Sequence, residues 1–243
     1  MTKVVPLTLN FLDQMTHSMS KAMPDNTEKL SRSATKINSP VAGYRETGLL
    51  NITGYVEESL ANGPGGPRAV VWTQGCQHAC RGCQNPDTWD TEKVIQLVSP
   101  EDLAERVLSN PNHRGVTYSG GEPFLQAAGL AAVSRTIREK KGLTTVCYSG
   151  FTYEELTGSY APDSAEEFLK EIDLLIDGRY VEALKSPDPK AHIWRGSANQ
   201  RLIWLRPDFL RAERQFDENV TEIHVLSNGT VIFTGFGGQA FQL

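Results

Sequence analysis

The sequence predicts an α/β fold in which strands and helices alternate along most of the 243-residue chain. Short apolar runs, such as the Val-rich residues 69–73, have the composition of buried strands. Signals for the start and the end of helices lie between such runs, notably Ser99 and Gly142. This alternation favours a parallel sheet with right-handed crossover connections.

The first predicted strands cover residues 49–56 and 69–73, and the second of them runs straight into a group of cysteines. A helix is predicted over residues 100–108. Ser99 is a suitable N-cap, Pro100 suits the first helical position, and two acidic residues follow in the first turn.

The segments up to residue 177 continue the alternation. Residues 115–118 form the next predicted strand, and Gly142 is placed to end the helix after it. The other predicted elements are a helix over residues 125–141, a strand over 144–148, a helix around Tyr153, a helix over 165–172 and a strand over 174–177.

The two ends of the chain differ from the middle. Residues 1–40 carry polar residues and scattered Met without a sustained period, which predicts a flexible, disordered extension before a domain over residues 41–243. A partner-docking arm is the alternative for this extension. Near the C-terminus, residues 222–226 and 230–234 flank Asn228-Gly229, a strong signal for a β-hairpin.

Composition excludes several classes of protein. The formal net charge of -5 does not favour binding to nucleic acid, which needs a basic face. No run approaches the roughly 20 apolar residues that cross a bilayer, and the N-terminus lacks a secretory pattern. We therefore expect a cytoplasmic protein without membrane contact, in which clustered cysteines indicate a metal site or catalysis rather than disulfides.

Three of the four cysteines fall within eight residues. Cys76, Cys80 and Cys83 have the spacing CxxxCxxC at the end of a predicted strand, and three thiolates on a [4Fe–4S] cluster leave one iron open. The alternatives are a structural zinc site with His78 as fourth ligand, or buried unreactive cysteines. Cys147 lies far along the chain and is expected to be a small buried residue.

Further motifs accompany the cysteines. CxxxCxxC followed by a strand that ends in Gly-Gly-Glu-Pro, residues 120–123, resembles the radical S-adenosylmethionine superfamily. Residues 62–68 resemble a segment of the glycyl-radical activases, and residues 75–89 and 194–201 resemble the activases of anaerobic ribonucleotide reductase. The resemblance covers about residues 48–202.

This resemblance implies a partial, open (βα) barrel of about five or six strands, with the site at the carboxyl ends of the strands. It implies a [4Fe–4S] cluster on Cys76, Cys80 and Cys83 that binds S-adenosyl-L-methionine and cleaves it reductively to a 5′-deoxyadenosyl radical. Such an oxidoreductase abstracts a glycine Cα hydrogen from a partner enzyme, most like anaerobic ribonucleotide reductase and next most like formate-lyase-type enzymes. A flavodoxin or ferredoxin is the implied reductant.

The same resemblance implies contacts to S-adenosylmethionine from the cysteine loop and from the strand ends. They are Gly82 and Gln84 beside the adenine; Gly120, Gly121 and Glu122 beside the methionine group; Ser149 at the methionine or ribose; and Asp177 and Arg179 at the ribose hydroxyls and the carboxylate. Tight turns and a structural salt bridge are the alternatives for these residues. Two roles stay open for Asn199, Gln200 and Arg201: they contact the target peptide or the adenine, or they satisfy backbone groups at a sheet edge.

Two other functions stay open at this point. One keeps the cluster but modifies a small molecule or a peptide, and a glycyl-radical enzyme encoded nearby would argue against it. The other is a non-enzymatic binding module with a saturated zinc or iron–sulfur knot. A measurement of iron and acid-labile sulfide distinguishes an iron–sulfur knot from a zinc knot.

Overall fold

The computed structural model describes residues 47–188, 190–206, 218–225 and 229–235. The predicted extension over residues 1–40 lies outside these ranges, so that prediction and the domain boundary after it remain predictions. No helix among the described residues is both long and apolar enough to cross a membrane.

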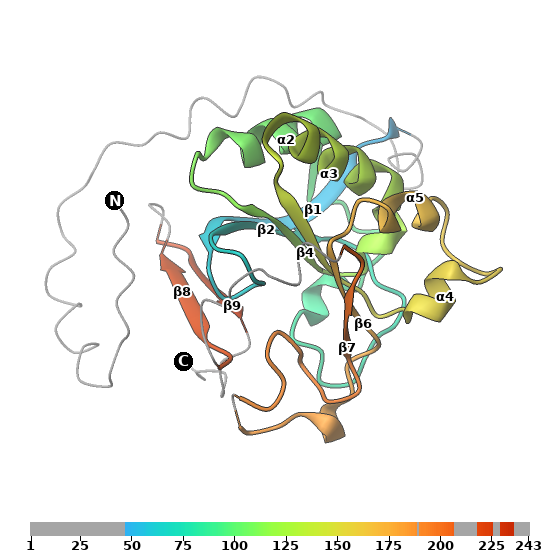
Figure 1. Cartoon of the computed structure of the whole chain (residues 1–243). Coiled ribbons are helices and arrows are strands. Elements are labelled where there is room, and N and C mark those ends of the chain that lie inside the picture. Colours follow the sequence, from blue (N-terminus) through green and yellow to red (C-terminus); the bar gives the residue numbers. More distant parts are fainter. Residues whose placement is uncertain (1–46, 189, 207–217, 226–228, 236–243) are drawn as a thin grey trace, which may run out of the picture. The chain divides into compact units, whose positions relative to one another are not determined.

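A seven-stranded sheet organises the described part of the chain, in the order β3-β1-β2-β4-β5-β6-β7 (Figure 1). Four neighbouring strands are parallel: β2 (Arg68–Thr73), β4 (Gly115–Gly120), β5 (Thr144–Tyr148) and β6 (Leu174–Asp177). β1 (Leu50–Ser59) is antiparallel to both β2 and β3 (Gln96–Val98), and β7 (Arg201–Trp204) is antiparallel to β6.

The predicted α/β class is therefore confirmed, and the predicted parallel sheet holds for its four central strands, whereas β1, β3 and β7 make the whole sheet mixed. β1 and β2 are joined by residues 60–67, a connection too short for the crossover that parallel neighbours need. β3 and β7 are short strands at the two ends of the strand order, and neither is among the strands predicted from the sequence. The partial barrel remains a prediction.

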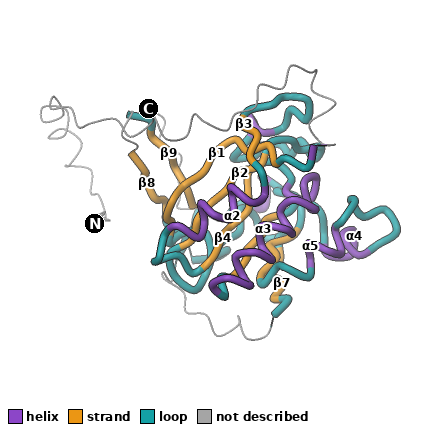
Figure 2. The backbone as a smooth tube through the Cα atoms, turned by 90° about the horizontal axis from the view of Figure 1, so that it is seen from above, coloured by secondary structure: helices purple, strands orange, loops and turns teal. Residues whose placement is uncertain are grey.

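Helices lie against one face of the sheet. Figure 2 shows α2, α3 and α5 side by side along the strands. The helices are α2 (Pro100–Ser109), α3 (Ala127–Lys141), α4 (Tyr153–Thr157) and α5 (Ala165–Leu169), with single 3₁₀ turns at Pro86–Thr88, Pro123–Gln126 and Glu182–Leu184. The main apolar core fills the space between these helices and the sheet.

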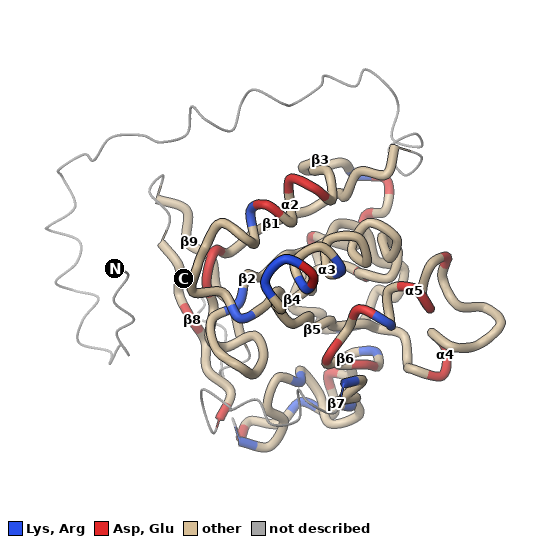
Figure 3. Tube along the Cα trace, turned by 45° about the horizontal axis from the view of Figure 1, so that its top comes forward, with Lys and Arg blue, Asp and Glu red and all other residues tan. Residues whose placement is uncertain are grey.

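The signals at the helix ends act as the sequence predicts. The Ser99 hydroxyl accepts a hydrogen bond from the Asp102 N–H at 3.0 Å, and Gly142 ends α3 in the left-handed conformation, with φ of 64°. Acidic residues occupy the first turn of α2 and basic residues the last turn of α3, where they complement the helix dipoles (Figure 3). α3 begins two residues later than predicted, after the 3₁₀ turn at Pro123–Gln126.

A second apolar cluster forms on strands β5 and β6. Val146, Tyr148, Leu174 and Ile176 pack there with a segment that follows β6 and includes Trp194. Burying one such side chain stabilises the fold by about 1.5–3 kcal/mol. This second cluster therefore covers a part of the sheet that lies close to the ends of the parallel strands.

A separate two-stranded antiparallel sheet is formed by β8 (Thr221–Val225) and β9 (Val231–Gly235). Its two strands match the segments that the sequence analysis paired, but Asn228 of the predicted turn lies outside the described residues. Asn219, just before β8, accepts from the Trp194 N–H at 2.7 Å and donates to the His192 carbonyl at 2.8 Å.

Candidate functional site

The cysteine loop is held in place by its main chain. It follows β2, and the N–H groups of Gly75 and Cys76 donate to the carbonyls of Thr88 and Trp89, at 2.8 and 3.0 Å. The Gly75 carbonyl accepts from the Glu122 N–H at 2.7 Å, which joins the loop to the end of β4. The loop therefore starts from a fixed position at the carboxyl edge of the sheet.

All three clustered cysteines are free thiols that line one cavity, whereas Cys147 is fully buried in the main core, as predicted. Burial raises the pKa of the Cys76 thiol to about 11 and also raises the pKa of Cys80. A metal ligand must be a thiolate, so metal binding here would release protons.

The cavity lies where four segments meet beyond the strand ends. Of the predicted cofactor contacts, Gln84, Gly120, Gly121, Glu122 and Ser149 line it, whereas Gly82, Asp177 and Arg179 do not. Lining residues that were absent from the predicted contacts include Ser119, Tyr148, Tyr180 and Gln200. Three of these adjoin predicted positions at strand ends, so their place in the chain was the available signal.

Glu122 is a fully buried carboxylate that joins three segments. One oxygen accepts from the Phe124 N–H at 3.0 Å and from the Ser149 hydroxyl at 2.9 Å. The other accepts from the Gly150 N–H at 2.7 Å and lies 3.1 Å from Nε2 of His78. Glu122 thus fastens the ends of β4 and β5 to the cysteine loop, and His78 braces that loop.

Two glycines make this close assembly of loops possible. A Cβ atom on Gly121 would lie 2.3 Å from the Gly75 carbonyl oxygen, and one on Gly150 would lie 2.2 Å from the His78 ring. Both distances are far shorter than a van der Waals contact. The backbone of Gly121 therefore approaches the cysteine loop in a way that no other residue type permits.

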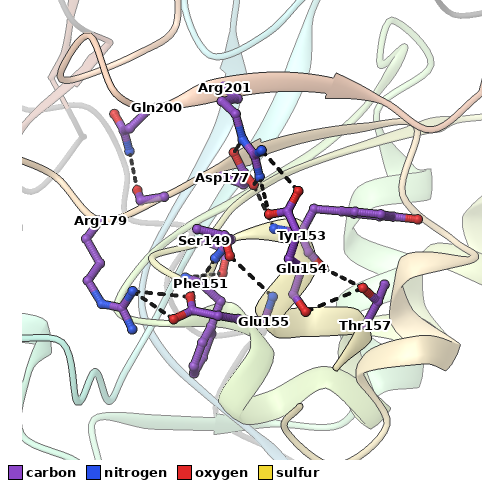
Figure 4. Close-up of polar contacts among 12 residues, drawn as sticks. Ser149, Phe151, Tyr153, Glu154, Glu155, Thr157, Asp177, Arg179, Gln200 and Arg201 are labelled. Atoms are coloured by element: carbon purple, nitrogen blue, oxygen red, sulfur yellow. Dashed lines mark hydrogen bonds and ion pairs between the residues drawn. The ribbon is translucent and has the colours of Figure 1, made fainter. Parts of the chain in front are cut away.

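Asp177 is also fully buried, but its carboxylate faces Arg201 and the start of α4 (Figure 4). It accepts from Arg201 Nε at 3.0 Å and from the Tyr153 N–H at 2.7 Å. Arg201 extends to Glu154 at 2.7 Å, and this hydrogen bond lowers the pKa of Glu154 to about 2. Asp177 is thus bonded to protein groups outside the cavity.

Arg179 and Gly82 likewise face protein neighbours. Arg179 donates to both carboxylate oxygens of Glu155, at 3.1 and 3.2 Å (Figure 4). Hydrogen bonding to the Thr152 N–H and to Arg179 lowers the pKa of Glu155. A Cβ atom on Gly82 would lie 2.8 Å from the Glu182 side chain. Direct contact of these residues with a cofactor remains a prediction.

Gln200 secures the segment after β6 beside the cavity. Its amide nitrogen donates to the Gly178 carbonyl at 3.0 Å, and its oxygen accepts from the N–H groups of Gly196 and Ser197, at 2.7 and 3.2 Å (Figure 4 includes Gln200). Of the two roles left open for Gln200, this geometry matches the satisfaction of backbone groups.

Known proteins match both this loop and the strands around it. The family model of the 4Fe-4S single cluster domain matches residues 61–203, more than half of the chain. An anaerobic ribonucleoside-triphosphate reductase-activating protein of Vibrio cholerae is 32% identical over 161 residues, which cover 62% of this chain and 96% of that protein. The chain belongs to the family of anaerobic ribonucleoside-triphosphate reductase-activating proteins.

Two further activating proteins extend this match. The protein of Enterobacteria phage T4 is 31% identical over 61% of this chain and 90% of its own length. That of Escherichia coli K12 is 28% identical over 65% of this chain and all of its own length. The crystal structure of QueE from Escherichia coli overlaps 58% of this chain and 76% of that chain, at 18% identity and a TM-score of 0.39.

Membership makes this activating protein a radical S-adenosylmethionine enzyme with a [4Fe–4S] cluster. The described residues fit that cofactor pair in two respects. Three free thiols on one loop face a shared cavity. The indole N–H of Trp89, which also lines the cavity, is buried without a hydrogen-bond partner in the described part of the chain.

A single metal ion fits the donors less well. In the described ranges, no three His, Cys, Asp or Glu side chains are grouped as they would be around one ion. The match to the 4Fe-4S single cluster domain favours an iron–sulfur cluster over the zinc knot considered above.

Proposed function

We propose that this chain activates an anaerobic ribonucleoside-triphosphate reductase by holding the cluster on Cys76, Cys80 and Cys83. The observation that carries the proposal is the shared cavity of three free thiols and two strand ends, in a chain whose relatives are activating proteins of that reductase. When bound, the cluster and S-adenosylmethionine supply the reductive cleavage that yields a 5′-deoxyadenosyl radical for glycine hydrogen abstraction.

The strand ends bind and orient the cofactor. Gly120 and Gly121 bring main-chain groups to the cavity, where carbonyl oxygens accept hydrogen bonds from an ammonium group. Ser149 and Gln84 provide polar side chains on two other walls. Trp89 offers an indole N–H to an anionic acceptor, because leaving it unpartnered costs about 1–3 kcal/mol.

Buried side chains keep the cavity in shape. Glu122 fixes the distance between the cysteine loop and the ends of β4 and β5. Asp177 and Arg179 do not line the cavity and act through other residues. Asp177 binds Arg201, and Arg179 binds Glu155 of α4. These contacts hold α4 and the segment after β6, whose Gly178 and Tyr180 line the cavity. We assign both a positioning role.

The remaining parts of the proposal concern the surroundings of the enzyme. We expect a flavodoxin or ferredoxin to supply the electron, and the reductase to present its glycine loop at the open side of a partial barrel. We also expect action in the cytoplasm without nucleic acid, and a separate extension over residues 1–40. The -5 net charge gives no obvious help to an acidic reductant.

The first test is cofactor cleavage by the anaerobically reconstituted protein. Wild type and Cys147→Ala should yield 5′-deoxyadenosine and bind about equal iron and sulfide, because Cys147 lies in the core and away from the cavity. Cys80→Ala should lose the product and most of the iron. If Cys80→Ala cleaved S-adenosylmethionine as well as wild type does, the proposed set of cluster ligands would be wrong.

The second test identifies the substrate. The anaerobic reductase of the source organism is incubated with the reduced activating protein and S-adenosylmethionine, and electron paramagnetic resonance records the glycyl radical. A radical on the reductase, lost when its glycine is replaced by Ala, supports the proposal. Cofactor cleavage without any radical on the reductase would favour a small molecule or peptide as substrate.

A further inference from the structure

The small sheet β8–β9 has an inverted pattern of polar and apolar side chains. Strands of half-buried sheets normally turn apolar residues inward and polar residues to solvent. Here four apolar side chains point outward and are 43–56% exposed: Ile223, Val225, Val231 and Phe233. In the strand register Ile223 lies opposite Phe233 and Val225 lies opposite Val231. These four side chains form what we call the outer hairpin face.

The inward face carries Glu222, His224, Thr234 and one apolar residue, Ile232, and two of its polar side chains are hydrogen-bonded to the rest of the fold. Glu222 accepts from the Leu60 N–H at 2.9 Å and from the Ser59 hydroxyl. The amide of Asn62 donates to the Thr234 hydroxyl, and Thr234 is almost fully buried. Because these bonds fix which face points inward, the hairpin cannot turn over to bury its apolar residues.

The hairpin also lies beyond the part of the chain that is shared with relatives. The family model ends at residue 203, and 90–100% of each of three activating proteins is covered by 61–65% of this chain. The outer hairpin face is therefore an addition to a common enzyme core. Extra contacts to one partner raise the affinity for it over the affinity for others.

We propose that the outer hairpin face is a docking surface for the glycyl-radical enzyme that this chain activates, and that it binds an apolar patch on that enzyme. This inference rests on the proposed function. Four side chains with these exposed fractions offer an area on the order of 300 Å². A stable dimer buries about 800 Å² on each partner, so this patch suits a transient contact better than a permanent dimer of two copies.

The test replaces all four outward side chains by Thr: Ile223→Thr, Val225→Thr, Val231→Thr and Phe233→Thr. Thr retains strand propensity and exposes its hydroxyl to water, so the hairpin should persist. We expect the Kd for the anaerobic reductase of the source organism to rise at least tenfold. Formation of 5′-deoxyadenosine without the reductase should stay within twofold of wild type, because no changed residue lines the cavity.

Tyr160→Ser is the matched control, because Tyr160 is 98% exposed on the loop between α4 and α5. It removes a large apolar side chain elsewhere and should leave Kd unchanged. An unchanged Kd in the fourfold variant overturns the inference, and so does an equal fall in cofactor cleavage, which would indicate a structural role. A wild-type dimer that the variant dissociates would make the occupant a second copy and also overturn it. If wild type cleaves the cofactor but neither binds nor activates the reductase, the proposed function fails instead.

Discussion

The amino and carboxyl edges of the parallel strands each contain a buried charge, with opposite signs. At the amino edge, Arg68 is fully buried and donates to the hydroxyl of Thr117 and to the carbonyls of Pro64, Val116 and Thr144. At the carboxyl edge, the carboxylate of Glu122 accepts from three donors and contacts His78. Both charges are satisfied without an exposed partner.

The edges differ in what surrounds the charge. Around Arg68, the chain folds back on itself and the hydrogen bonds complete the packing of the strand starts. Around Glu122, the hydrogen bonds join the ends of β4 and β5 to the cysteine loop, whose three thiols line the cavity. At both edges a buried charged side chain is hydrogen-bonded by protein groups. At the amino edge this completes the packing, whereas at the carboxyl edge the charged side chain lies beside the cavity.

Replacing Arg68 should have the largest effect on stability. Arg68→Met retains the aliphatic volume but leaves several buried acceptors without a donor, which should lower the free energy of unfolding by about 3–5 kcal/mol. Urea unfolding of the cluster-free protein measures this. Lys170→Met, which alters an exposed pair with Glu166, is the control and should change little. Similar midpoints for the two variants would contradict a structural role for the amino edge.

Glu122→Gln should reduce function more than stability. The amide has one acceptor oxygen instead of two and meets N–H donors with its own NH₂ group, so the cysteine loop loses its brace. We expect a loss of about 2–3 kcal/mol in stability and a loss of about 10–100-fold in cluster affinity. Iron and sulfide analysis after reconstitution measures the second quantity. Full cluster loading in this variant would show that the loop holds its shape without Glu122.

Gly121→Ala tests the close approach of two backbones. The added methyl group meets the Gly75 carbonyl and should displace the cysteine loop, at a cost of about 1–3 kcal/mol and with reduced cluster content. Gly142→Ala is the comparison at a helix end, where the new Cβ meets open space but the left-handed backbone costs about 1 kcal/mol. Only the first variant should lose iron, and equal iron in both would refute the steric argument.

The smallest effect is expected at the exposed pair of Glu154 and Arg201. Arg201 lowers the pKa of Glu154 from 4.5 to about 2, so its contribution to stability is present above pH 4.5. This contribution disappears as the pH falls from 4.5 towards 2. The difference in unfolding midpoint between wild type and Glu154→Gln should follow that course and shrink with added salt. A difference that is constant with pH would show that the charge is unimportant.

Local signals in the sequence predicted the elements that the chain specifies locally. The cap at Ser99, the end of α3 at Gly142 and the four parallel strands all carry short-range patterns. β3 and β7 were missed because they contain no fully buried residue, so no run of buried apolar side chains marks them, whereas the equally short β6 is buried throughout. The antiparallel direction of β1 follows from the connection over residues 60–67, which is too short for a crossover.

The sequence predicted where the candidate site lies better than it predicted what each residue does there. Strand ends beside CxxxCxxC located the cavity, and five of eight predicted contacts line it. The sequence could not show that Glu122 and Asp177 are occupied by protein donors, because their partners come from other strands and helices. Whether a polar side chain is free for a ligand depends on tertiary neighbours, which composition and spacing do not reveal.

The contacts of Glu122 also join parts of the chain that lie far apart in the sequence. His78 and Glu122 are 44 residues apart in the chain, and Glu122 and Ser149 are 27 apart. Non-local contacts of this kind depend on the pairing of the strands that carry them. The brace on the cysteine loop is therefore complete only when β4 and β5 lie together, so a substitution that weakens the pairing of these two strands should also loosen the loop.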